Sequence, residues 1–450
     1  MASQDSAADE DWLRRWDTVT PTGSRRAHDP CYGPVFVRGE GSCLWDSEGH
    51  TWIDLTCGFS ATNFGHAHPR LLQALQQQAS ELGHVTGDPH PRRIELAELI
   101  ASKFQRSAEQ RFKTNFSTSG ARAVEAAWKI ASSLRPGKLI ALAPSLHGRS
   151  IATSILSSTK RIELSESLAS RTRLQPVENY PYCVRCPLGK EFPSCETACG
   201  DDLFSLIECD SGSISGVLVE PALTARGYVF PPAEWFLRLR EVTAKANITL
   251  IADEIQTGMG RCGGLLLSQQ QGWPADLTLL GKSLGGGLTS IACVVGTEAF
   301  LDRLPPGVES ETGAANPIAC AVALEAIRIL EEDSLIERGV HVGKELRRIC
   351  SELLPASLTR IEGQAACCAI EFLDQEAAPG HDCQLAQAFA SACASRRLKV
   401  HLTGPLQTRV VLLPPLVMTD DELYESQRRL TRAAEIVNWS EPFKPGKTDD

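Results

Sequence analysis

Long hydrophobic runs and long basic runs are both missing from this 450-residue sequence. No apolar stretch approaches the roughly 20 residues that a membrane-spanning helix needs, so we expect no membrane segment. The net charge is −10, and no group of lysines and arginines is long enough to form a nucleic-acid surface. Residues 1–5 include an acid and lack the basic start and apolar run of a secretory signal. These absences predict a cytoplasmic protein that binds neither membrane nor nucleic acid and whose cysteines are mostly reduced.

Patterns that mark several other enzyme classes are also missing. The sequence shows no internal repeat, and neither a Ser-His-Asp set nor a pair of catalytic carboxylates can be argued from it. The glycine run at 285–287 lacks the surrounding spacing of a nucleotide-binding loop. The composition, 42% hydrophobic and 22% charged, is typical of a soluble globular protein. A chain of this length exceeds one hydrophobic core, so we expect two unequal domains.

Strand-like and helix-like segments alternate through the middle of the chain, from about residue 115 to about residue 300. This alternation predicts an α/β fold with a mostly parallel sheet. The expected helices are 121–134 and 233–245, and the expected strands are 138–143, 248–252, 277–280 and 291–296.

The two ends of the chain follow different patterns. Residues 1–33 are polar and irregular in composition, and they are expected to form an arm or a frayed lead. Residues 35–46 are expected to form a hairpin around a glycine turn. Apolar residues in 68–82 recur at helical spacing. After a helix near 316–332, the chain shifts to a smaller α+β section that ends in a helix from Asp420 and a disordered tail. We therefore assign 1–64 to an N-terminal arm and part of a small domain, 65–325 to a large domain, and 326–450 to the rest of the small domain.

Asp253 and Lys282 are the most informative pair of residues. Asp253 closes a β-rich apolar run and is expected at the carboxyl end of a buried strand, where open α/β sheets bind ligands. Lys282 lies in a short glycine-rich loop after another apolar run, 277–280. A lysine amine that condenses with a cofactor aldehyde, with an aspartate that holds a proton on a pyridine nitrogen, is the minimum set for pyridoxal-phosphate (PLP) chemistry. Taken singly, such a lysine is more often a solvated turn residue, and such an aspartate more often a helix cap.

The sequence around both residues resembles a known family. Residues 253–261 (Asp-Glu-Ile-Gln-Thr-Gly-Met-Gly-Arg) and 281–287 (Gly-Lys-Ser-Leu-Gly-Gly-Gly) are similar to the signature of class III (ornithine/GABA-type) aminotransferases, which are fold-type I PLP enzymes. The likeness extends from about Pro34 to about Leu430. It implies a large PLP-binding domain with a mostly parallel sheet, a smaller α+β domain built from the N- and C-terminal segments, and Lys282 as the catalytic lysine.

The resemblance also implies the contacts of the cofactor pocket. Small residues at the start of the helix after residue 120 let backbone N–H groups approach a phosphate, although Ser-Gly before a helix is ordinarily only an N-cap. Gln256 matches the residue beside the cofactor's phenolic oxygen, and Thr312 matches a threonine that reaches the phosphate from the other subunit. The second match implies a homodimer with active sites at the interface. The implied cofactor-binding residues are Ser119, Gly120, Ala121, Leu146, His147, Glu220, Asp253, Gln256, Lys282 and Thr312.

Aromatic and charged positions of the family pattern are altered near the pocket. Leu146 replaces the aromatic residue that stacks on the pyridine, and Gly313 replaces another aromatic, so both changes remove bulk. Arg122 stands where the family usually has glutamate, and could either reinforce anion binding or face solvent. Either the cofactor ring is held less firmly in this chain, or the pocket needs room for a larger substrate.

The residues that recognise a substrate carboxylate in many members are also changed. Val411 occupies the position of their carboxylate-binding arginine, while Arg409, two residues earlier, would share a strand face with it. Arg409 is a weak candidate for a carboxylate ligand, and the alternative is a surface or interface residue. Ala225 replaces the glutamate that masks this arginine in some relatives. The joint loss predicts an enzyme that does not use glutamate or 2-oxoglutarate in the ordinary way.

Four cysteines lie close together in an insert rich in proline and glycine: Cys183, Cys186, Cys195 and Cys199. Their spacing is compatible with a closed structural zinc site. The alternative is a loop whose thiols fill small gaps, as in similar stretches of relatives without an implied metal. We assign no metal ligand.

These observations favour a PLP-dependent aminotransferase that acts on a small-molecule amino acid or amine, with a non-standard substrate and a biosynthetic role. Lys282 would move the substrate proton as general base, and Asp253 would keep the ring nitrogen protonated. The alternative is an epimerase, or an enzyme that eliminates, replaces or joins carbon at the side chain in a specialised pathway, using the same stabilised carbanion. A further alternative is a non-catalytic zinc-bearing relative.

Overall fold

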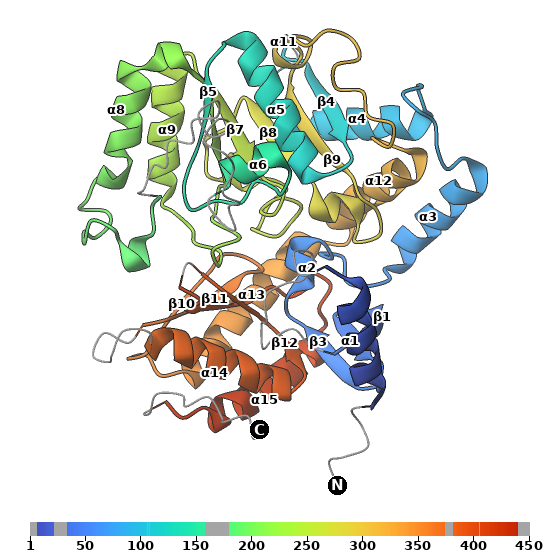
Figure 1. The fold of residues 1–450 in the computed structure, drawn as a ribbon, viewed down its shortest axis with the longest axis vertical. Helices are drawn as coiled ribbons and strands as arrows, with labels where there is room; N and C mark the ends of the chain where they lie inside the picture. The colour runs from blue at the N-terminus through green and yellow to red at the C-terminus, as the bar shows by residue number, and fades with distance from the viewer. Residues whose placement is uncertain are drawn as a thin grey trace. The chain divides into compact units, whose positions relative to one another are not determined.

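A computed structural model describes residues 7–21, 34–105, 107, 109–157, 180–373, 381–404 and 406–439. The chain divides into two compact units, each with its own sheet structure and hydrophobic core (Figure 1). The larger unit is Pro69–Ser334, and the smaller unit combines Met1–His68 with Leu335–Asp450.

A six-stranded sheet forms the centre of the larger unit, in the order β4-β9-β8-β7-β6-β5. Neighbours from β5 to β8 pair in parallel, whereas β9 runs antiparallel to both β8 and β4. The sheet is therefore mostly parallel, which confirms the predicted α/β fold class. The strands are β4 (Phe112–Ser117), β5 (Lys138–Ala141), β6 (Ile214–Val219), β7 (Thr249–Asp253), β8 (Leu277–Leu280) and β9 (Ala292–Thr297).

The strands β6 to β9 are buried almost throughout, which explains why they read as largely apolar runs. Because side chains alternate along a strand, Val217 and Val219 of β6 join a core with α8 (Asp201–Cys209) and α9 (Ala233–Lys245). Leu218, between them, joins a second core with α5 (Gly120–Leu134) (Figure 1). Full burial of one such side chain contributes about 1.5–3 kcal/mol relative to exposure.

Shorter helices and helical turns complete the larger unit. They are α3 (Pro69–Glu81), α4 (Pro91–Phe104), α6 (Ile151–Leu156), α10 (Leu267–Gln270), α11 (Glu298–Leu301), α12 (Pro317–Glu332), η2 (Cys183–Arg185), η3 (Ala198–Gly200), η4 (Ser211–Ser213) and η5 (Lys282–Gly285).

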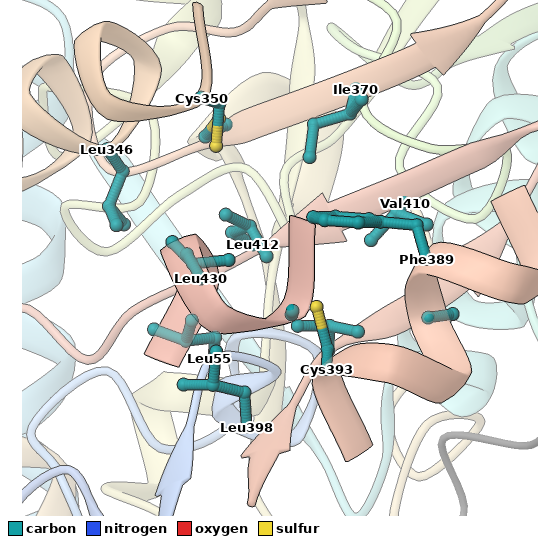
Figure 2. Close-up of a cluster of buried hydrophobic side chains, with 14 of the residues drawn as sticks. Leu55, Leu346, Cys350, Ile370, Phe389, Cys393, Leu398, Val410, Leu412 and Leu430 are labelled. Atoms are coloured by element: carbon teal, nitrogen blue, oxygen red, sulfur yellow. The ribbon is translucent and has the colours of Figure 1, made fainter. Parts of the chain in front are cut away.

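The smaller unit joins the two ends of the chain through a shared sheet and a shared core. β12 (Leu398–Lys399) pairs in parallel with β3 (Thr51–Asp54), and β3 continues the hairpin of β1 (Phe36–Glu40) and β2 (Cys43–Asp46). The core brings Leu55 together with Leu346, Ile370 and Leu430 (Figure 2). The remaining elements are α1 (Ala7–Val19), α2 (Cys57–Ser60), α13 (Leu335–Leu353), α14 (His381–Ser395), α15 (Asp420–Ile436), and an antiparallel sheet in the order β10-β11-β14-β13: β10 (Thr359–Glu362), β11 (Cys368–Phe372), β14 (Arg409–Leu412) and β13 (His401–Thr403).

Most of the expected elements are present, with two corrections. The first correction is α1 (Ala7–Val19), a helix that the sequence patterns did not predict within 1–33, although Trp12 and Trp16 share one side at i, i+4 spacing. The strand expected at 138–143 ends at Ala141, where its ladder with β6 ends. The tail expected at 441–450 lies outside the described residues. Where the structure describes the chain, none of its helices is long and apolar enough to cross a membrane.

Candidate active site

Loops that follow the parallel strands bring the candidate residues to one edge of the six-stranded sheet. Asp253 ends β7, Glu220 follows β6, and Lys282 comes two residues after β8. His147 lies in the segment after β5, and Ser119 comes two residues after β4. These strands share one direction, so their carboxyl ends lie along the same edge. Ligands bind at this edge in open α/β sheets.

Lys282 is a largely buried amine in a constrained turn. It begins η5 with φ of +47°, in the left-handed region that residues other than glycine rarely adopt. Its Nζ donates a hydrogen bond to Oε1 of Gln256. Burial lowers the pKa of Lys282 to about 8, although Asp253 and Glu220 act to raise it. The amine therefore becomes neutral, and nucleophilic, far more readily than an exposed lysine.

Asp253 and His147 form a buried pair. Nδ1 of His147 lies 2.7 Å from Oδ2 of Asp253, and the backbone N–H of Ile255 donates to Oδ1 at 3.2 Å. These contacts fix the orientation of the carboxylate. Nε2 of His147 is buried and has no hydrogen-bond partner among the described residues.

Glu220 ties together the loops that follow β5 and β6. Its Oε1 accepts from the backbone N–H of Leu146 at 2.9 Å, and its Oε2 accepts from the N–H and hydroxyl of Thr224 at 3.1 and 2.6 Å. Burial raises the pKa of Glu220, and the charge of Asp253 adds to that rise. Leu146 is thereby held at the site through its backbone, whatever its side chain contacts.

Tyr228 was missed by the sequence analysis, although it supports Gln256. Nε2 of Gln256 donates to the hydroxyl of Tyr228 at 2.8 Å, while Oε1 of the same amide accepts from Lys282. Tyr228 sits at φ of +57° in the turn that follows Glu220. No local pattern reveals this contact, because it joins residues 28 positions apart.

Ser119, Gly120 and Ala121 form the start of α5. The hydroxyl of Ser119 caps the helix by accepting from the N–H of Arg122 at 3.4 Å. A Cβ on Gly120 would lie 2.9 Å from Cδ1 of Ile255, so a larger residue would require the Ile255 side chain to shift. The unpaired N–H groups and the dipole of this helix start favour an anion.

Glu311 is a second residue that the sequence analysis missed. Its Oε2 accepts from the N–H and hydroxyl of Thr118 at 3.1 and 2.7 Å, and its Oε1 accepts from Nε of Arg122 at 2.8 Å. Burial opposes these contacts, yet together they lower the pKa of Glu311. Arg122 also bonds to Glu125, so it neither faces solvent freely nor stands free for an anion. Thr312, the next residue in the chain, is exposed.

Arg409 lies in the smaller unit and is fully buried between carboxylates. Its Nη1 donates to Glu371 at 2.7 Å, and both Nη atoms donate to Glu362 at 2.9 Å. The alternative of a surface residue is wrong, because the guanidinium is enclosed by its own unit. Because Arg409 is bonded to these two acids of its own unit, its geometry favours a structural role over a role as substrate ligand. Val411 is buried as well.

The four clustered cysteines show no metal-binding arrangement. Across the parts of the chain that the structure describes, which include all four, no three His, Cys, Asp or Glu side chains gather as metal ligands would. Burial and the neighbouring thiols raise the pKa of Cys199 to about 11.

The residues at the sheet edge fit PLP. Asp253 offers a buried carboxylate for a protonated pyridine nitrogen, Lys282 offers an amine for an aldehyde, and the start of α5 offers N–H groups for a phosphate. The orphaned Nε2 of His147 supports this fit. An unsatisfied buried nitrogen costs about 1–3 kcal/mol, and such atoms mark places where a ligand or water belongs.

Comparison with known proteins agrees with this assignment. The family model described as Aminotransferase class-III matches residues 24–434. The chain is 30% identical to the ornithine aminotransferase of Emericella nidulans over 424 residues, which covers 90% of this chain and 87% of that one. It is 34% identical to the 5-aminovalerate aminotransferase of Pseudomonas aeruginosa over 350 residues, covering 76% and 78% of the two chains. An amine transaminase from an uncultivated Pseudomonas species, solved with PLP bound, superposes with a TM-score of 0.77 at 25% identity, covering 93% of this chain and 96% of that one.

The fold and the site define a PLP-dependent transferase of fold type I. The chain belongs to the class III aminotransferase family.

Proposed function

We propose that this aminotransferase carries out its reaction with the residues gathered at the carboxyl edge of the larger unit's sheet. The observation that supports this most directly is the set formed by Lys282, Gln256, Asp253 and His147, in which a low-pKa amine lies near an oriented carboxylate. When bound, PLP supplies an aldehyde that condenses with amines and a protonated ring that draws electrons from the adjacent carbon.

In this proposal each residue has one task. Asp253 holds a proton on the ring nitrogen, and His147 keeps its carboxylate oriented. Lys282 would take up the substrate proton at its Nζ and release it again, a transfer that suits a pKa of about 8. Gln256, braced by Tyr228, positions the lysine amine. Ser119, Gly120 and Ala121 hold the phosphate at the start of α5.

The proposed substrate is an amino acid or amine outside the glutamate/2-oxoglutarate pair. Relatives are named for ornithine, 5-aminovalerate and 4-aminobutyrate, which carry an amine distant from a carboxylate. Val411 and Ala225 stand where many members have the arginine and glutamate that handle a dicarboxylate. A neutral residue provides no bidentate partner for that second carboxylate.

A homodimer and a cytoplasmic location are part of the proposal. The exposed Thr312 supports the dimer, since it matches a threonine that reaches the phosphate of the other subunit. The 15 cysteines of the described residues form no disulfide, which suits a reducing compartment. Light scattering of the purified protein and fractionation of its host cells test these two points.

Absorbance spectroscopy of the holoenzyme tests the reaction. Single amino acids and amines are added without a keto acid, and the donor is expected to convert PLP to its amine form, pyridoxamine phosphate. Glutamate is expected to do so poorly, and efficient conversion by glutamate would refute the substrate proposal. Exchange of the substrate's α-hydrogen in heavy water, without pyridoxamine phosphate, would instead favour an epimerase or side-chain chemistry.

A further inference from the structure

Arg226 is a partly buried guanidinium without a counter-ion in the larger unit. No acid among the described residues forms an ion pair with it, and its Nε is buried without a hydrogen-bond partner. Burial lowers the pKa of Arg226, and no carboxylate in the described part of the chain acts to raise it again. Burying an unpaired charge is costly, whereas the more deeply buried Arg409 is paired twice. The unmatched guanidinium is therefore suited to an anionic ligand.

The turn that carries Arg226 is fastened to the candidate active site on both sides. Two residues before it, Thr224 bonds to Glu220, and two residues after it, Tyr228 bonds to Gln256. The turn is closed by the N–H of Gly227, which donates to the carbonyl of Thr224 at 3.1 Å. Consecutive Cα atoms are about 3.8 Å apart, so an arginine at the tip lies within side-chain reach of the space these two anchors border.

The position at which many members of the family have a carboxylate-binding arginine provides no cation in this chain. Val411 is apolar, and Arg409 is held by Glu371 and Glu362. Lys282 is not a candidate for binding the carboxylate, because the proposed function uses its amine in the reaction.

We propose that Arg226 binds the carboxylate of the amino-acid substrate, through the paired N–H groups that suit guanidinium to carboxylate. This inference rests on the proposed amino-group transfer at Lys282. It adds a specificity-determining residue that the family signature does not include.

The contacts around Lys282 indicate which carboxylates Arg226 would select. Nζ of Lys282 donates to Gln256, Gln256 donates to Tyr228, and Arg226 precedes Tyr228 by two residues. Two side chains therefore link the amine to the turn that carries the guanidinium. The substrate that fits this arrangement is an amino acid whose reacting amine is several bonds from its carboxylate.

Calorimetry of the PLP-loaded enzyme with unreactive probes tests the proposal. Pentanoate carries the carboxylate without an amine, pentanamide is its neutral counterpart, and acetate is the short carboxylate. Wild type is expected to bind pentanoate more tightly than pentanamide or acetate. Arg226→Gln is expected to weaken pentanoate about ten- to hundredfold, the range for a hydrogen bond to a charged group, and to leave pentanamide unchanged. Arg226→Lys keeps the charge but loses the paired N–H groups of the guanidinium. Its affinity for pentanoate should therefore lie between those of wild type and Arg226→Gln.

Arg238→Gln is the matched control, because Arg238 pairs with Asp201 on the exposed side of α9 and should bind pentanoate like wild type. Equal pentanoate affinity in wild type and Arg226→Gln would overturn the proposal, as would a wild type that does not distinguish pentanoate from pentanamide. If Arg226→Gln melts early or loses PLP, the same comparison with Arg226→Lys decides. The proposed function is judged separately, by whether wild type converts PLP to pyridoxamine phosphate with pentylamine, an amine that has no carboxylate for Arg226.

Discussion

Removal of Arg409 should test whether this residue belongs to the fold or to substrate binding. Its guanidinium and the Glu371 side chain are both fully buried, and Glu362 is largely buried. Arg409→Leu would leave Glu371 as a buried carboxylate without the counter-charge of Arg409, although the hydroxyl of Thr408 still donates to it at 2.8 Å. Breaking a buried ion pair from one side typically costs about 3–5 kcal/mol, because the remaining charge is uncompensated. At an unfolding entropy of about 2.1 cal/mol/K per residue, the loss lowers the melting temperature by about 3–5 °C if the whole chain melts together, and by more if the smaller unit melts alone.

Differential scanning calorimetry of the holoenzyme measures this effect. The double variant Arg409→Leu/Glu371→Leu removes both charges of the buried pair and should recover much of the lost stability, since apolar replacement of a buried pair is often nearly neutral. Steady-state kinetics supplies the second readout, with KM for a carboxylate substrate expected to stay within about twofold of wild type at a temperature well below melting. An unchanged melting temperature together with a KM raised tenfold or more would refute the structural assignment and restore Arg409 as a substrate ligand.

Three further predictions concern the site in the larger unit. Lys282→Ala should abolish amino-group transfer and the covalent attachment of PLP, so borohydride reduction followed by mass spectrometry should find no modified lysine in this variant; transfer at the wild-type rate would contradict the proposed mechanism. The rate at which apoprotein takes up PLP should rise with pH and level off above about pH 8, because the pKa of Lys282 is lowered to about 8 and only the neutral amine attacks; a pH-independent rate between pH 6 and 8 would be inconsistent with this. Asp253→Asn removes a charge that raises the pKa of Lys282, so the midpoint of that pH profile should move to lower pH, and a shift to higher pH would contradict the assigned charge balance.

Sequence patterns predicted the larger unit well because its sheet is buried on both faces. The run Leu277–Leu280 is apolar except for Thr278 and is followed by Gly281 and Lys282, so both the strand and the position of Lys282 after it could be anticipated. α1 was missed because its polar composition masked the helical spacing of Trp12 and Trp16. Contacts between distant segments carry no such signal. The pairing of Arg409 with Glu371 depends on the register of β11 against β14, which no local pattern specifies.

The difference between local sequence patterns and contacts of distant segments also applies to two charged residues near the site, Glu311 and Arg226. Both are charged residues in loops, and their sequence neighbours give no reason to treat them as other than solvated. Their three-dimensional settings differ: Glu311 is satisfied by Thr118 and Arg122, whereas Arg226 has no acid against it among the described residues. The presence or absence of a partner therefore separates a structural charge from a candidate ligand-binding charge, and only the folded chain reveals it.

If Arg226 binds the substrate carboxylate, a different part of the structure sets the distance between that carboxylate and the reacting amine. Val411, at the position where many members of the family have a carboxylate-binding arginine, is a residue of the smaller unit. Arg226 and Lys282 both belong to the larger unit, on loops that follow β6 and β8, and β7 lies between these strands in the same sheet. Their separation is then set by the packing of one sheet, which is rigid because buried strands resist displacement. A site of this kind selects substrates by the fixed span between amine and carboxylate, and it would need no removable glutamate, consistent with Ala225 at the position where some relatives carry one.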